Sequence, residues 1–176
     1  MEALVVRLGA TADAVALNAL VNSAFRGESS RAGWTTEEHL LGGQRIDVDR
    51  LVESLSNPDV AVLVHEREGI PVACLLLERT GEDCYLGMMT VRPTAQGRGL
   101  GRQMLETAEQ WAREHWSPRS MHMTVIVQRT ELIAWYERRG YRRTGVRKPF
   151  PYGDERFGLP KRDDLEFEVL SKPLRT

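Results

Sequence analysis

The sequence has few cysteines, no long apolar run and almost no excess of charge of either sign. Two cysteines stand among 176 residues, and the formal net charge at pH 7 is −1. A membrane-spanning helix needs about 20 consecutive apolar residues, which no stretch provides. The large basic excess that suits nucleic acid or anionic membranes is also missing. We therefore expect a soluble globular protein whose main partner is neither nucleic acid nor membrane.

Cys74 and Cys84 lie inside apolar segments, where a thiol behaves as a small buried hydrophobic group. Two cysteines without nearby histidines do not make a zinc site, so we expect no metal. The N-terminal stretch MEALVVRLGATAD lacks the basic start and long apolar centre of a signal peptide. The cytoplasm is therefore the expected location.

Length and composition are those of one globular unit. The hydrophobic share of 41% and the charged share of 28% are close to globular averages. A chain of 176 residues is long enough for one core and short for two. Since it also contains no repeat and no low-complexity linker, we predict a single domain over residues 1–176.

The first third of the chain predicts a strand at residues 3–8 and then a helix. Thr11 or Asp13 would be the N-cap of this helix. The helix is predicted from apolar residues at a spacing of three and four: Leu17, Leu20, Val21, Ala24 and Phe25. The stretch from 26 to 58 is polar and glycine-rich, and predicts a loop with two short helical segments, TTEEHLL (35–41) and DVDRLVESL (47–55).

Strand patterns dominate from Val60 onward. Runs at 60–66, 72–79 and 84–91, separated by turns, predict an antiparallel meander. Helices are predicted at 100–115 and 130–140 and strands at 121–128, 141–146 and 164–170, with a long polar connection at 148–163. In the helix at 100–115, Met104 and Leu105 lie on the apolar face and Glu109 on the polar side. This order predicts an α+β fold with a mixed, mostly antiparallel sheet.

The segment QGRGLGR, residues 96–102, places three glycines at the start of the predicted helix at 100–115. Unpaired amides and the dipole at a helix start suit an anion such as a phosphate. The dinucleotide fingerprint fails because Arg102 stands where its third glycine belongs, and the Gly-Lys-Ser/Thr ending of the P-loop is missing. A tight turn without a ligand is the alternative.

Two separate motifs resemble the markers of the GNAT superfamily of N-acetyltransferases. Gln96, Gly99 and Gly101 in VRPTAQGRGLGRQML match its Gln/Arg-x-x-Gly-x-Gly/Ala signature for acetyl-CoA. Downstream, LIAWYERRGYRRTG is similar to its second marker, a Tyr-Glu-x-x-Gly-Phe/Tyr helix end. The resemblance implies a three-layer α/β/α acyl-CoA N-acyltransferase fold with about seven strands. It also implies an N-acetyltransferase that uses acetyl-CoA as acyl-donor substrate.

The resemblance further implies which residues bind the donor. The strand end at Met89, Thr90 and Val91 would offer main-chain hydrogen bonds to the pantetheine arm. The pyrophosphate would lie on the loop that follows the signature glutamine, Gln96. This loop consists of Gly97, Arg98, Gly99, Leu100, Gly101 and Arg102, and its two arginines would add positive charge.

Tyr136 occupies the position of the superfamily's motif tyrosine, which implies a general acid for the departing thiolate. The alternative is a core-facing aromatic residue three positions after Ile133. The general base stays open among four side chains and a chain of waters; the side chains are Glu82, Asp83, His122 and Glu38. Arg129 stands where the family commonly has asparagine, and Leu132 where a small residue is usual. Arg129 suits either a phosphate contact or a solvated charge at the helix start.

The acceptor is expected to be a primary amine of a small molecule or a protein. The loops at 26–47 and 148–163 would shape its cleft through several polar side chains, which are otherwise ordinary surface residues: Arg31, Trp34, Glu38, His39, Tyr152, Asp154, Glu155 and Arg156. A catalytically silent acyl-CoA sensor is the alternative function, and an O-acyl or succinyl transferase a weaker one. The oligomeric state, including a homodimer, stays open.

Overall fold

Seven strands form the main sheet within the part of the chain that the computed structural model describes, residues 4–26, 30 and 33–175. They are β1 (Arg7–Leu8), β3 (Val60–Arg67), β4 (Ile70–Thr80), β5 (Asp83–Val91), β6 (Ser120–Ile126), β7 (Arg142–Pro149) and β9 (Glu166–Pro173). Their order is β1-β3-β4-β5-β6-β9-β7, and only the β5–β6 pair is parallel among these described strands. The predicted mixed, mostly antiparallel sheet is confirmed.

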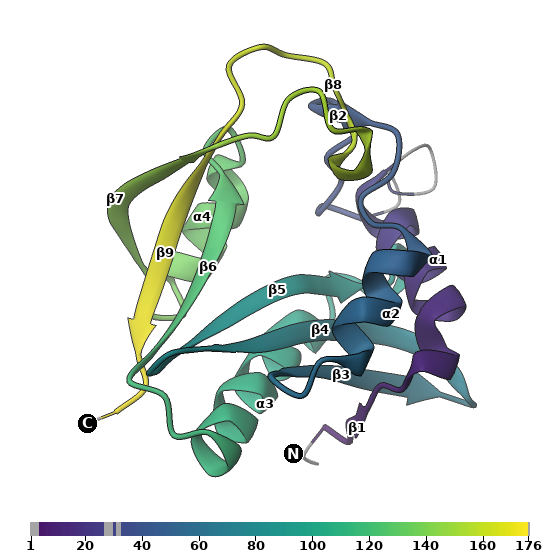
Figure 1. Cartoon of the computed structure of the whole chain (residues 1–176), viewed down its shortest axis with the longest axis vertical. Helices are drawn as coiled ribbons and strands as arrows, with labels where there is room; N and C mark the ends of the chain where they lie inside the picture. Colours follow the sequence, from purple (N-terminus) through teal and green to yellow (C-terminus); the bar gives the residue numbers. More distant parts are fainter. Residues whose placement is uncertain (1–3, 27–29, 31–32, 176) are drawn as a thin grey trace.

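Helices cover both faces of this sheet (Figure 1). On one face lie α1 (Ala14–Phe25) and α2 (Val48–Ser56), and on the other α3 (Leu100–His115), while α4 (Thr130–Glu137) packs near β7. Side chains alternate along β3, so Val62 and Val64 pack with α1 and α2 while Leu63 joins the cluster under α3. Short 3-10 turns lie at Thr11–Asp13, Pro93–Ala95 and Glu155–Phe157. The three-layer fold is confirmed.

The predicted helix at residues 35–41 is wrong. This stretch holds a single turn, in which the amides of Leu40 and Leu41 bond to the carbonyl of Glu37. It then enters β2 (Leu41–Gly42), which pairs with β8 (Leu159–Pro160) from the long connection. Tertiary bonds override the helical pattern, since the amide of Glu37 donates to the carbonyl of Phe25 at the end of α1. The β2–β8 pair thereby joins the polar segment that precedes α2 to the long connection at 148–163. The first predicted strand is also shorter than expected, and its residue 3 lies outside the described residues.

Strands β5 and β6 separate after a short contact, as Figure 1 shows. Within the described residues they pair at Cys84 with Met121 and at Tyr85 with His122, and then diverge. Farther along β5 the register with β4 shifts between Cys74 and Leu76, and Met88 adopts a left-handed φ of 55°. Such a β-bulge bends a strand and redirects its edge. One edge of β5 from Gly87 to Val91 therefore faces the gap between the two strands.

Glu109 is buried, although the helical pattern predicted it on the polar side of α3. Its side chain accepts hydrogen bonds from the Tyr141 hydroxyl at 2.9 Å and from the Lys172 ammonium at 2.8 Å. A buried carboxylate needs such partners. The polar side of α3 is thus partly covered by the end of β9.

Both cysteines are buried and free, as predicted, and burial raises the pKa of each thiol to about 12. No group of three or more potential metal-binding side chains lies among the described residues. No helix in this part of the chain combines the length and the apolar composition required to cross a bilayer.

Replacing the α1 residue Leu17 by alanine is expected to lower the free energy of unfolding by about 2 to 5 kcal/mol, because the side chain is fully buried. Val15→Ala in the same helix removes a side chain that is 70% exposed, and should change it by less than about 0.5 kcal/mol. Urea denaturation measures both. Equal losses would contradict the placement of α1 on the sheet.

Candidate active site

The loop before α3 presents a row of unpaired backbone amides. Gly97 and Gly99 have φ values of 82° and 78°, a conformation that favours glycine, and a Cβ on either would meet open space. Within the described residues, no amide from Gly97 to Arg102 has a hydrogen-bond acceptor. Because these amides lie at the positive end of a 16-residue helix, they form a ready site for an anion.

A cavity of about 340 Å³ lies beside this loop. Many predicted residues line it: Met89, Val91, Gln96, Gly97, Gly99, Gly101, Arg102 and Tyr136. Three others do not. The side chains of Thr90 and Leu100 are buried elsewhere in the core, and Arg98 is exposed at the loop tip.

Gln96 holds the site together through its side chain. Its amide nitrogen donates to the Val91 carbonyl at 2.9 Å and to the Thr35 hydroxyl at 2.7 Å, while its oxygen accepts from the Trp34 amide at 2.8 Å. A Cβ on Gly33 would overlap this side chain. Gln96 therefore ties the polar segment after α1 to the end of β5.

Sequence reasoning missed three residues of this cavity, Thr35, Trp135 and Arg139. It expected Trp34 in the acceptor cleft and noted Leu132 only as a departure from the family pattern, and both line this cavity. The rings of Trp34 and Trp135 lie 6.1 Å apart, and the guanidinium of Arg139 stacks 3.8 Å from the centre of Trp135. Trp135 directly precedes the motif tyrosine, which was the available signal. Arg139 and Arg102 place two positive charges around the cavity.

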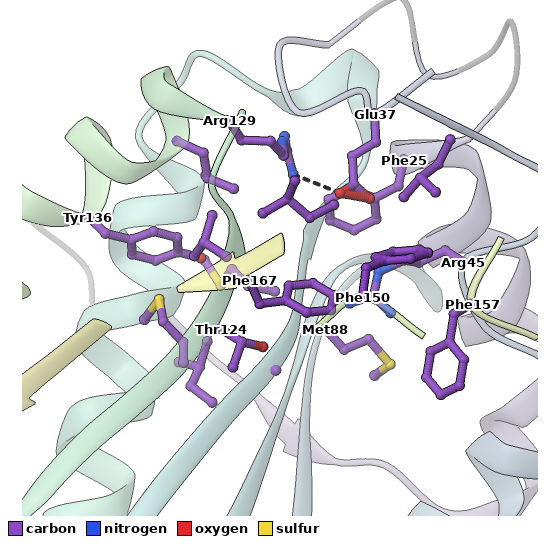
Figure 2. Close-up of a pocket in the computed structure, with 18 of the residues that line it drawn as sticks. Phe25, Glu37, Arg45, Met88, Thr124, Arg129, Tyr136, Phe150, Phe157 and Phe167 are labelled. Carbon is purple, nitrogen blue, oxygen red and sulfur yellow. Dashed lines mark ion pairs between the residues drawn. The ribbon is translucent and has the colours of Figure 1, made fainter. Parts of the chain in front are cut away.

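A second cavity of about 260 Å³ occupies the gap between β5 and β6 (Figure 2). Its apolar lining includes four phenylalanines, Phe25, Phe150, Phe157 and Phe167, besides the β5 and β6 side chains Met88, Met123 and Ile126. Its charged lining within the described chain consists of Arg26, Glu37, Arg45 and Arg129. Arg26 and residues 37–45 thus border this gap together with the connection 148–163, and the β2–β8 pair joins the last two segments.

The two cavities meet at Tyr136. Met89, Leu132 and Tyr136 line both of them. The tyrosine is 5% exposed and packs against Trp135 and Tyr141, so it is also the core aromatic of the alternative interpretation. Burial raises the pKa of Tyr136 to about 12. Within the described residues its hydroxyl has no hydrogen-bond partner, which leaves it available to a ligand.

Three of the four charged side chains form a buried network. Arg26 donates to Glu37 at 2.6 Å, and Arg129 lies 3.4 Å from the other carboxylate oxygen and donates to the Thr35 carbonyl at 2.7 Å. Burial opposes the ionisation of Glu37, but the nearby arginines outweigh it and lower the pKa of this carboxyl. Arg129 is 8% exposed, which rules out one of its two alternatives, a solvated charge at the helix start.

Comparison with known proteins gives a consistent result. A sequence model described as the acetyltransferase (GNAT) family matches residues 20–141. An IAA acetyltransferase from Azospirillum brasilense is 33% identical over 111 residues, which cover 61% of this chain and 70% of that protein. The chain belongs to the GNAT acetyltransferase family.

Solved structures show the same fold. The ribosomal-protein-S18-alanine N-acetyltransferase from Escherichia coli superposes with a TM-score of 0.71 at 14% identity, covering 98% of this chain and 94% of that one. A putative acetyltransferase from Salmonella typhimurium, solved with its cofactor acetyl-CoA, gives 0.68 at 20% identity, covering 99% and 95%. The family model supports acetyl transfer for this GNAT chain, and the solved structures show its fold.

The side chains considered as general base lie away from Tyr136 in this GNAT structure. Glu82 and Asp83 sit at the β4–β5 turn, where both pair with Arg119. The His122 ring lies 5.6 Å from the ring of Tyr85 and is tilted against it, and His122, like Glu38, does not line either cavity. Glu37, which sequence reasoning missed, is the carboxylate that lines the second cavity within the described chain.

The two segments that were predicted to shape the acceptor cleft both line the second cavity, but mostly through other side chains than the predicted ones. Glu38, His39, Tyr152, Asp154, Glu155 and Arg156 do not line the second cavity; their neighbours Glu37, Phe150, Pro151 and Phe157 do. Trp34 lines the first cavity instead, and Arg31 lies outside the described residues. No periodicity marks which residue of an irregular segment points inward.

Gln96→Ala is expected to weaken acetyl-CoA binding by about 10-fold or more and to lower the unfolding free energy by about 1 to 3 kcal/mol, because several polar partners lose their bonds. Calorimetry and thermal denaturation measure these effects. Gln103→Ala, a change of the same residue type in the following helix α3 and outside both cavities, is the control. Unchanged affinity and stability in Gln96→Ala would contradict the tie.

Proposed function

We propose that this GNAT chain transfers the acetyl group of acetyl-CoA directly to the amine nitrogen of a small molecule. The observation that carries the proposal is the junction of the two cavities at Met89, Leu132 and Tyr136. A donor in the first cavity and an acceptor in the second would meet beside the Tyr136 hydroxyl. Direct attack within one complex then needs no covalent enzyme intermediate.

The donor would lie along the loop and the free edge of β5. The amides of residues 97 to 102 would bind the pyrophosphate, with Arg102 and Arg139 adding charge. The pantetheine arm would follow the β5 edge from Met89 to Val91, which has no strand partner on that side within the described residues. The Val91 carbonyl already accepts a bond from Gln96, so its remaining lone pair would serve the arm.

The chemistry follows from these positions. The amine lone pair attacks the thioester carbonyl carbon, and the C–S bond then breaks with its electron pair on sulfur. The Tyr136 phenol, protonated at neutral pH, donates a hydrogen bond and then its proton to that sulfur. A cysteine-like thiol has a pKa of about 8.5, so complete transfer of a proton from this phenol to the thiolate is unfavourable by itself. It becomes possible if the proton released by the amine nitrogen reprotonates the phenol. Atoms balance with one amide and one thiol formed.

Deprotonation of the acceptor ammonium is assigned to water. Glu37 is held ionised between Arg26 and Arg129, and its lowered pKa makes it a weak base. The same feature supports the competing proposal, a silent acyl-CoA sensor. A screen of amines for release of free CoA separates the two, because a sensor binds acetyl-CoA and releases none above hydrolysis.

Tyr136→Phe is expected to lower kcat by about 100-fold or more, the usual contribution of a general acid, with little change in acetyl-CoA affinity. Steady-state kinetics and calorimetry measure the two quantities. Tyr141→Phe is a matched control, because it removes a second buried phenol that lines neither cavity, and should keep kcat within about three-fold. Full activity in Tyr136→Phe would remove this residue from the acid role.

The pH dependence provides a separate test. Burial raises the pKa of Tyr136 to about 12, so the phenol stays protonated well beyond its ordinary titration near 10. We expect kcat to rise as the amine loses its proton and then to stay level up to about pH 10. A fall in kcat with an apparent pKa near 9, present in the native protein and missing from Tyr136→Phe, would show the opposite.

A further inference from the structure

We propose that the acceptor is a small amine that carries a carboxylate on an apolar body, and that Arg45 binds this carboxylate. The inference rests on the proposed function, since it concerns the acceptor side of the same site. It goes beyond it by assigning a second functional group to the acceptor and a residue that selects for it. The charge balance of the second cavity is the starting observation.

The second cavity has two positive charges in excess. Arg26, Arg45 and Arg129 line it, and within the described chain only Glu37 opposes them. Burial lowers the pKa of the Arg26 guanidinium; Glu37 opposes this effect, and repulsion from Arg45 and Arg129 adds to it. Arg26 is 5% exposed, and its Nε has no hydrogen-bond partner among the residues that the structure describes. A protein interior tolerates such an excess poorly unless an anion balances it.

Arg45 is the arginine that is available to a ligand. Arg26 and Arg129 are engaged with Glu37, but the Arg45 guanidinium has no hydrogen bond or ion pair within the described residues. Its backbone is fixed, since its amide donates to the Asn22 side chain at 2.5 Å, and its guanidinium lies 5.7 Å from the centre of the Phe25 ring. A planar, always charged group held beside an aromatic ring suits a carboxylate.

The remaining surface of the cavity selects for an apolar body. Phenylalanines, methionines and aliphatic side chains make up most of the lining. Its volume of about 260 Å³ corresponds to roughly nine water-sized groups. Figure 2 shows Tyr136 at one side of the cavity and Arg45 with Phe157 at the other. An amine at one end and a carboxylate at the other, with a ring or short alkyl body between them, fit this arrangement.

Pairs of amines that differ in the carboxylate test the inference. The first pair is 4-(aminomethyl)benzoate and 4-methylbenzylamine, and the second is L-phenylalanine and phenethylamine. With acetyl-CoA as donor, release of free CoA gives kcat/KM for each. We expect at least a 10-fold preference for the carboxylate in one pair or both, larger in the first because its two groups lie farther apart.

Arg45→Gln should abolish this preference. We expect kcat/KM to fall by about 10- to 100-fold for the carboxylated amine of each pair and to change little for the amine without a carboxylate. Arg67→Gln makes the same charge change at an exposed site outside both cavities, and should leave both rates unchanged. Three results would each overturn the inference: equal rates within both pairs, a preference for the amines without a carboxylate, or a preference for the carboxylated amines that survives Arg45→Gln.

A binding measurement keeps the inference separate from the proposed function. Calorimetry with 4-methylbenzoate, in the presence of CoA, reports the carboxylate site without turnover. Binding that Arg45→Gln weakens at least 10-fold supports the site, even if no amine releases CoA and the proposed transferase activity fails. Absence of 4-methylbenzoate binding, together with acetylation of carboxylate-free amines, overturns the inference and leaves the transferase activity intact.

Discussion

The divergence of β5 and β6 is the constraint on which the rest of the structure depends. Within the described chain, the two parallel strands pair only at Cys84 and Tyr85 of β5, and the bulge at Met88 then bends β5 away from β6. A closed sheet would leave β5 without a free edge and would fill the second cavity with paired backbone. Because the strands separate, one cavity forms beside α3 and another between the strands. Tyr136 lies where they join.

The buried charges explain how the second cavity is closed. Desolvation of ions costs several kcal/mol each, and an apolar replacement of a buried ion pair is often neutral or stabilising. Stability alone therefore gives a weak reason for Arg26, Glu37 and Arg129. Their arrangement has a further effect, since Arg26 ends α1, Glu37 belongs to the irregular segment and Arg129 precedes α4. The network fixes three separate parts of the chain around the proposed acceptor.

The sequence was sufficient for most regular elements and for the glycine-rich loop before α3. Periodicity located α1, α3 and the meander, and the glycines of QGRGLGR marked the turn that enters α3, where Gly97 and Gly99 have left-handed backbone. It failed where long-range contacts decide. The pattern at 35–41 predicted a helix, but the hydrogen bond from the Glu37 amide to the Phe25 carbonyl favours another backbone path. Glu109 was predicted on the polar side of its helix, but Lys172 binds it there and contributes to its burial. Arg26 and Arg45 carry no local pattern, because only the meeting of segments far apart in sequence makes them neighbours.

The excess of arginine bears on the deprotonation step of the proposed reaction as well as on specificity. A positive charge disfavours an ammonium nearby, so the field of the cavity lowers the pKa of a bound amine. At an effective dielectric constant of about 20, one unit charge about 8 Å away contributes about 2 kcal/mol, or about 1.5 pKa units. A carboxylate on the acceptor cancels only one of the two excess charges. The remaining charge then favours the neutral amine, which lets water remove the proton without a dedicated carboxylate or histidine base.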